Sequence, residues 1–160
     1  MLATIAYSLA LAAIGTTPAG PCDLLDRSAA GALLGAPVSK MEPSGPEPDE
    51  ETGATRTICA YQAGQRMLIV VRLDFPNAGA AREATAAEMQ PDKLSETNAT
   101  AKEESGLGDK AYLVYTPKAI QYVVVKGPSV LSLILGGMPN ALTTYEAPLR
   151  SDAAAATKKL

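Results

Sequence analysis

The two cysteines are the residues whose type and spacing indicate chemistry most directly. Cys22 and Cys59 are the only cysteines among 160 residues, so a single intramolecular pairing is open to them. In the chain-entropy model, a bridge that closes a loop of this length stabilises the folded state by about 4 kcal/mol. The sequence therefore predicts a Cys22–Cys59 disulfide, and such bridges persist in oxidising compartments outside the cytoplasm.

Histidine is absent from the sequence, which excludes much of the usual chemistry of active sites. Without an imidazole base, neither a Ser-His-Asp nor a Cys-His nucleophile can be assembled. Two cysteines alone cannot complete a structural zinc tetrahedron. Glu103, Glu104 and Asp109 lie close together along the chain, but they do not define a catalytic carboxylate pair. We therefore expect no catalytic residues, no metal site and no cofactor.

The stretch Ser105–Asp109 is the most motif-like part of the sequence, with Gly106 and Gly108 on either side of Leu107. Its backbone N–H groups could present themselves to an anion, but phosphate-binding loops precede a helix, whereas a strand is expected here. The alternative is a turn whose glycines take positive φ and whose leucine plugs the edge of the core. We favour the turn.

The strands expected between residues 110 and 135 are apolar on both faces. A sheet with one face in water would show polar residues on that side. Either the central strands are covered on both faces, or one face lines a groove for a ligand or partner. Tyr112, Tyr115, Tyr122 and Leu133 lie in this region, and we predict that they contribute to a ligand-binding or partner-binding surface.

Length and charge limit the class of protein. A chain of 160 residues suits one domain rather than two of ordinary size. The net charge is −3, from 14 basic and 17 acidic side chains, and no basic stretch is long enough to neutralise several phosphates. Nucleic acid is therefore not expected as a partner.

The N-terminal segment 1–19 carries no charged side chain, and most of it is apolar. Its apolar run is too short to span a hydrocarbon core of roughly 30 Å, whereas a signal peptide has such a run. We predict a signal peptide at 1–19, cleaved after Gly15 or Ala19; a buried N-terminal helix is the alternative. No transmembrane segment is expected in the mature chain.

The residue before the first cysteine bears on membrane anchoring. A lipid-modified cysteine requires a small residue immediately before it, and Pro21 occupies that place ahead of Cys22. Lipid anchoring is therefore not expected, and the disulfide is favoured. Residues 20–160 are predicted to be a single secreted or cell-envelope domain.

The first half of this domain is expected to form a helix, a loop and a β-hairpin. Asp26 is typical of a helix N-cap and Gly35 of a helix stop, which predicts a short helix between them. Residues 42–54 combine three prolines with five carboxylates and are predicted to be a mobile acidic loop. Strands are predicted at 55–62 and 66–75, where apolar side chains alternate, so that Cys59 points into the core.

The second half is expected to add helices and the rest of the sheet. Asn77 predicts the start of a helix over about 78–90, and a second helix is expected near 151–159. A strand candidate at 96–102 precedes the strands at 110–115, 119–126 and 129–135, which are joined by tight turns. The order predicts an α+β fold with an antiparallel sheet of five to six strands and helices packed on one side.

Several of these short segments together resemble known exported proteins. The segments are Cys22–Asp26, Leu33–Gly35, Ile58–Tyr61, Gly106–Tyr112 and Val124–Gly127. In this order they resemble small exported actinobacterial proteins of unknown function, many of them lipoproteins. The resemblance implies a PsbP-like α+β sandwich and supplies no catalytic residues. The proline before Cys22 departs from the lipoprotein pattern.

Three functions are consistent with these observations. The first is a non-enzymatic, exported domain that binds a partner protein or a small apolar ligand through its sheet. The second is a structural or inhibitory protein of the cell envelope. The third is a histidine-independent hydrolase, which would require carboxylate, tyrosine or lysine side chains converging in a cleft. We expect the first.

Overall fold

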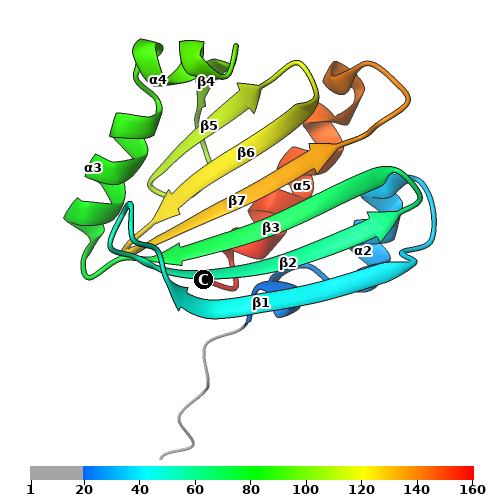
Figure 1. The fold of residues 1–160 in the computed structure, drawn as a ribbon, viewed down its shortest axis with the longest axis horizontal. Helices are drawn as coiled ribbons and strands as arrows, with labels where there is room; N and C mark the ends of the chain where they lie inside the picture. The colour runs from blue at the N-terminus through cyan, green and yellow to red at the C-terminus, as the bar shows by residue number, and fades with distance from the viewer. Residues whose placement is uncertain (1–19) are drawn as a thin grey trace, which may run out of the picture.

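A computed structural model describes residues 20–160 as one seven-stranded antiparallel sheet flanked by helices (Figure 1). The spatial order of the strands is β1-β2-β3-β7-β6-β5-β4. The strands are β1 (Lys40–Pro48), β2 (Thr55–Ala63), β3 (Arg66–Asp74), β4 (Thr100–Glu104), β5 (Lys110–Tyr115), β6 (Ala119–Lys126) and β7 (Ser129–Gly136). The predicted α+β class and antiparallel sheet are confirmed, with seven strands instead of five or six.

Helices lie on both faces of the sheet, not on one side as predicted. The helices are α1 (Pro21–Leu24), α2 (Arg27–Leu34), α3 (Ala78–Glu88), α4 (Pro91–Glu96) and α5 (Glu146–Thr157), with a 3-10 turn η1 (Leu142–Tyr145) before α5. Figure 1 shows α2 and α5 behind the sheet, whereas α3 stands to one side of the opposite face, with α4 above it. We call the two sides of the sheet the α5 face and the α3 face.

The larger core lies on the α5 face. Cross-strand partners such as Cys59 and Val70, or Tyr122 and Leu133, bring fully or almost fully buried side chains together there. Leu149 of α5 joins them in the same cluster. On the α3 face, a smaller cluster joins the sheet to the helix and is formed by Ala54, Phe75, Ala81, Tyr112, Val114, Val123, Val125 and Val130. The two faces are therefore covered to different extents.

The local signals for the first helix are confirmed in detail. The Asp26 carboxylate accepts a hydrogen bond from the backbone N–H of Ala29 at 2.8 Å, which satisfies one of the free donors at the helix start. Gly35 ends α2 in the left-handed conformation with φ of 63°. The short α1, which was not predicted, precedes this helix and carries Cys22.

The segment predicted to be a mobile acidic loop is mostly a strand. Residues 40–48 form β1, the edge strand that pairs with β2, and a loop follows only at 49–54. Prolines are tolerated here because one side of an edge strand needs no hydrogen-bond partner. The like charges are compensated as well, since Arg56 of β2 bonds Glu47 at 2.7 Å and Asp49 at 3.2 Å.

The remaining elements follow the prediction with shifted boundaries. Asn77 caps α3 as expected, with its side chain accepting from Ala80 N–H at 2.9 Å. Pro91 ends the α3 segment and also begins α4, because proline suits the first turn of a helix. The strand candidate at 96–102 is β4 at Thr100–Glu104, and the last helix begins earlier than predicted.

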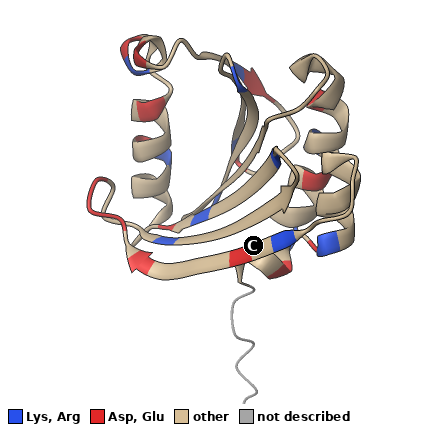
Figure 2. Cartoon of the chain, turned by 45° about the vertical axis from the view of Figure 1, so that its right-hand side comes forward, with Lys and Arg blue, Asp and Glu red and all other residues tan. Residues whose placement is uncertain are grey.

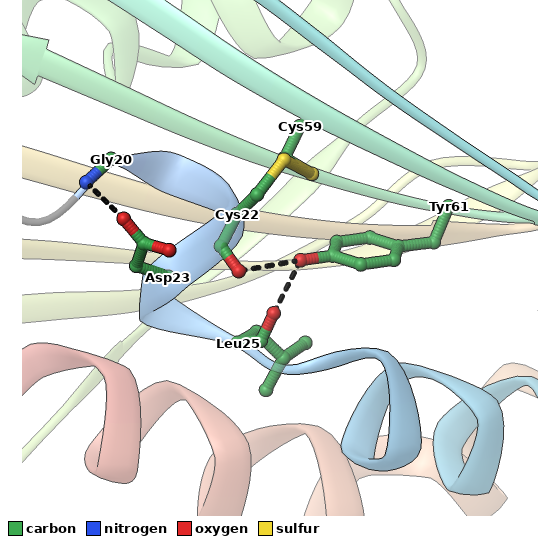
Figure 3. Close-up of a disulfide and its surroundings, with 6 residues drawn as sticks. All are labelled: Gly20, Cys22, Asp23, Leu25, Cys59 and Tyr61. Atoms are coloured by element: carbon green, nitrogen blue, oxygen red, sulfur yellow. Dashed lines mark hydrogen bonds between the residues drawn. A yellow bond between two sulfur atoms is a disulfide. The ribbon is translucent and has the colours of Figure 1, made fainter.

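The predicted disulfide is present between Cys22 and Cys59, with 5.2 Å between their Cα atoms (Figure 3). It joins α1 to β2 on the α5 face, where Cys59 is fully buried as expected. The predicted signal peptide at 1–19 lies outside the described residues. Among residues 20–160, no helix has the length and apolar character needed to cross a membrane.

Candidate functional site

A groove of about 360 Å³ lies on the α3 face, between the sheet and the α3–α4 segment. Its volume falls within the range of small-molecule sites in proteins. The lining residues are Glu51, Thr52, Leu73, Phe75, Ala84, Thr85, Glu88, Met89, Lys93, Leu94, Glu96, Thr97, Ala99, Val114, Thr116, Gln121, Val123, Val130 and Ser132. The floor comes from the sheet and the wall from α3, α4 and the loop after β1.

The groove forms because α3 has a narrow apolar face. Only Ala81 and Thr85 of this helix are buried. The Thr85 hydroxyl donates to the carbonyl oxygen of Ala81 at 2.8 Å, so its hydrogen-bond partner is the backbone of the same helix. Beyond these residues, Ala84 and Met89 are half-buried and line the groove, because no larger side chain fills the space between helix and sheet.

The floor of the groove is apolar except for one polar pair. Val114, Val123 and Val130 provide alkyl surface from three strands. Between them, the Gln121 side-chain amide donates to the Ser132 hydroxyl oxygen at 3.1 Å. The serine O–H and the glutamine carbonyl oxygen can therefore still bond a ligand. A few placed polar groups in an apolar site are typical of small-molecule recognition, where they fix orientation.

The sheet continues beyond the groove as an apolar surface that no helix of the described chain covers. This open strip consists of Ile58, Ala60, Ile69, Val71 and Ile134, all half-buried on the α3 face of β2, β3 and β7. It borders the groove directly, because Val71 pairs with Ser132. At the start of β3, Met67 is 42% exposed on the same face.

Charged side chains stand at the mouth of the groove. Glu51 lies in the loop after β1, Glu88 at the end of α3, and Lys93 and Glu96 in α4. All four side chains are exposed. The Lys93 ammonium group and the Glu96 carboxylate form an exposed ion pair at 3.7 Å. Figure 2 shows acidic positions on that loop and along α3. The carboxylates are thus solvated at the rim and not buried against the apolar floor.

The loop that carries Glu51 is ordered by its own hydrogen bonds. The Asp49 carboxylate accepts from the backbone N–H of Thr52 at 3.0 Å and from its hydroxyl at 2.9 Å. These bonds, with the Arg56 guanidinium, lower the pKa of Asp49 below its ordinary value. Thr52 and Glu51 are consequently held at the groove by a charged anchor.

The structure places the four predicted surface residues on two faces of the sheet. Tyr122 and Leu133 are cross-strand partners inside the α5-face core, with exposures of 2% and 0%. Tyr112 is 8% exposed within the small cluster on the α3 face. Tyr115 is half-buried, and its hydroxyl donates to the Glu146 carboxylate of α5. None of the four lines the groove.

Two of these tyrosines, Tyr115 and Tyr122, lie near charged side chains of β4 and α5. Burial, followed by the hydrogen bond and charge of Glu146, raises the pKa of Tyr115 well above its ordinary value. Burial is also the main cause that raises the pKa of Tyr122. Glu104 has its pKa lowered by Lys102 first and by Arg150 as well. In both tyrosines the raised pKa favours the protonated, uncharged hydroxyl.

The glycine-rich segment is the expected turn. Gly106 and Gly108 have φ values of 77° and 54°, and Leu107 is 3% exposed in the larger core. A strand, β5, follows at Lys110 in place of a helix N-terminus. Within residues 20–160, no group of three or more histidine, cysteine or acidic residues is arranged to hold a metal ion.

The residues that line the groove were not predicted as a site. Gln121 and Ser132 looked like ordinary positions of strands that are otherwise apolar. The signal in the sequence was that each of these two neighbouring strands carries one polar residue on a face that is otherwise apolar. It could be recognised only with the pairing of β6 and β7, which places Gln121 and Ser132 diagonally across adjacent strands.

The sequence matches no protein-family model, and no curated protein matches it. Among solved structures, the fold is similar to that of the extracellular domain of PknH from Mycobacterium tuberculosis, with a TM-score of 0.56 and 15% sequence identity. The likeness covers 91% of this chain and 98% of that domain. At this identity the comparison concerns the fold alone. The PsbP-like sandwich implied by the resemblance is not confirmed.

Proposed function

We propose that this chain is an exported, non-enzymatic domain that binds a small apolar ligand in the groove on the α3 face. The observation that carries the proposal is the groove itself, with an alkyl floor, one polar pair and an open strip beside it. Sheets in water normally expose polar residues, so an apolar face left partly open indicates a binding surface.

Export is supported by independent features. The Cys22–Cys59 disulfide suits an oxidising compartment. The similar fold in PknH belongs to an extracellular domain of a mycobacterial protein. The uncharged, apolar segment 1–19 is typical of a signal peptide.

A binding role is favoured over catalysis by the chemistry of the groove. Its buried and half-buried lining consists of alkyl groups, the Phe75 ring, the Met89 thioether, hydroxyls and one amide, whereas its carboxylates and lysine stand exposed at the mouth. Hydrolysis without histidine would require titratable side chains converging on one reacting atom. The groove instead offers area for apolar contact and two hydrogen-bonding groups for orientation.

The proposal is tested by blocking the groove. Ala84 of α3 lines it, whereas Ala87 of the same helix is exposed and does not. The purified wild-type chain, Ala84→Phe and Ala87→Phe are analysed by native mass spectrometry and by extraction of co-purifying small molecules. We expect an apolar compound with the wild type and with Ala87→Phe, and its loss from a folded Ala84→Phe. Retention of the compound by Ala84→Phe would overturn the proposal.

A further inference from the structure

The charges at the mouth of the groove are unequal. Three carboxylates, those of Glu51, Glu88 and Glu96, stand against the single ammonium group of Lys93. Lys93 lies 3.7 Å from Glu96 and so offsets one of them. Within residues 20–160, the side chains of Glu51 and Glu88 form no ion pair. The mouth therefore presents two uncompensated negative charges to any bound molecule.

The nearby arginine does not reverse this balance. Arg56 lies on the same face of β2, but its guanidinium is engaged by Glu47 at 2.7 Å and by Asp49 at 3.2 Å. An anionic head group at the mouth would meet Glu51 and Glu88 with no unengaged cation among the lining residues. A cationic head group would complete two ion pairs that the chain leaves open.

We propose that the groove selects amphiphiles whose head group carries a positive charge, with the apolar tail on the valine floor and the head between Glu51 and Glu88. This inference rests on the proposed function, because it assigns the ligand class to the same groove. The open strip extends the apolar surface past the Gln121–Ser132 pair, so a tail longer than the groove has further contact area along Val71 and Ile69.

The test compares three probes with one tail and different heads: decyltrimethylammonium, decyl maltoside and decyl sulfate, each below its micelle concentration. Binding to the purified chain is measured by calorimetry at low ionic strength. Exposed ion pairs contribute modestly, so we expect the cationic probe to bind about three- to tenfold more tightly than the anionic one, with the neutral probe between them. At 1 M salt the preference should fall below about twofold.

Matched variants assign the preference to the rim. The double variant Glu51→Gln with Glu88→Gln should bind all three probes with nearly equal affinity, because the size of both side chains is kept. Glu83→Gln removes an exposed carboxylate that is also in α3 but does not line the groove, and it should keep the preference. Far-ultraviolet circular dichroism checks that each variant is folded.

The outcomes separate this inference from the proposed function. If no probe binds, or if Ala84→Phe leaves binding of every probe unchanged, the proposed function fails and this inference fails with it. If Ala84→Phe weakens binding but cationic and anionic probes bind equally, only the head-group inference is overturned. A preference that persists in the double variant overturns it as well, since the charge would then act from elsewhere.

Discussion

At the scale of single residues, a tyrosine hydroxyl holds the start of the described chain against the sheet. Tyr61 of β2 is fully buried, and its O–H donates to the carbonyl oxygen of Leu25 and, at 3.4 Å, to that of Cys22 (Figure 3). Burial, followed by the charges of Asp26 and Asp23, raises the pKa of Tyr61 to about 12. The folded state therefore favours the protonated hydroxyl, which is the form that donates to both carbonyl oxygens.

Replacing this tyrosine should expose its contribution to stability. Tyr61→Phe leaves the Leu25 carbonyl without its donor, so we expect the free energy of unfolding to fall by about 1–3 kcal/mol at pH 7. The folded-state pKa exceeds the ordinary value of 10.0, so the stabilising effect is complete below pH 10 and is lost as the pH rises towards 12. Urea unfolding at pH 7 and pH 11 should therefore show the difference between wild type and Tyr61→Phe shrinking.

A second tyrosine serves as the control for this experiment. The Tyr145 hydroxyl accepts a 3.4 Å hydrogen bond from the Asn140 amide at the surface, so Tyr145→Phe should change stability little at either pH. A Tyr61→Phe variant as stable as wild type at pH 7 would contradict the role assigned to the hydroxyl.

Two turn glycines allow backbone strain to be separated from close packing. Gly108 and Gly127 have φ of 54° and 55°. An alanine at either position would therefore have to adopt a left-handed backbone conformation. A Cβ at Gly108 would lie 2.4 Å from the Val125 carbonyl oxygen, whereas a Cβ at Gly127 meets nothing within 4 Å. The two alanine variants therefore share the strain of a positive φ, but only the one at position 108 adds a steric clash.

We expect Gly127→Ala to lower the free energy of unfolding by about 1 kcal/mol, the cost of the conformation alone. Gly108→Ala should lower it by about 1–3 kcal/mol more, because the backbone of β6 must move to admit the methyl group. Chemical denaturation of both variants measures the difference. Equal effects would show that the β6 backbone yields without cost.

At the scale of elements, local signals were sufficient where a helix end or a strand pattern was self-contained. Asp26, Gly35 and Asn77 marked helix boundaries through hydrogen bonds and a left-handed residue, which depend on a few neighbours only. The alternation along β3 was equally readable. However, the alternating set Ile69, Val71 and Leu73 lies on the half-open α3 face, because the even-numbered residues face the larger core.

Elements whose stability comes from their neighbours were not predictable. β1 combines prolines with like charges, a composition typical of loops, and it is a strand because β2 supplies the pairing and Arg56 the counter-charge. The groove has the same origin. Its floor is defined by which residues of β5, β6 and β7 lie opposite one another, and its wall by how far α3 stands from them. A single sequence contains neither relationship.

The disulfide acts between elements, because it fixes the short α1 to β2. Replacing both cysteines by alanine should lower the free energy of unfolding by about 3–4 kcal/mol in the chain-entropy model. The fold should persist, since Leu24, Leu25 and Leu34 still pack into the same core. Urea unfolding with and without reductant measures the effect: reductant should destabilise the wild type and leave the double variant unchanged. Free thiols in the native, oxidised wild type would contradict the bridge.

At the scale of the whole molecule, the helices on the two faces of the sheet bury unequal numbers of side chains against it. On the α5 face, α5 buries Leu149, Ala153, Ala156 and Thr157 against the larger core. On the α3 face, α3 buries only Ala81 and Thr85, and α4 buries no residue. Local opening is easiest where few apolar contacts must be broken, so the layer that forms the wall of the groove is the one that opens at the lowest free energy.

This asymmetry can be measured by native-state hydrogen exchange. The helices α3 and α5 have similar lengths, 11 and 12 residues, so they form a matched pair within one molecule. Amides of α3 should exchange through openings of lower free energy than those of α5, which should approach the global unfolding limit. In the proposed complex an amphiphile contacts both the sheet and α3, so saturation with it should slow exchange in α3 and leave exchange in α5 nearly unchanged. Equal protection of α3 and α5 in the free protein would contradict the difference in packing between the two faces. Protection by the ligand that is centred on α5 would contradict a binding site on the α3 face.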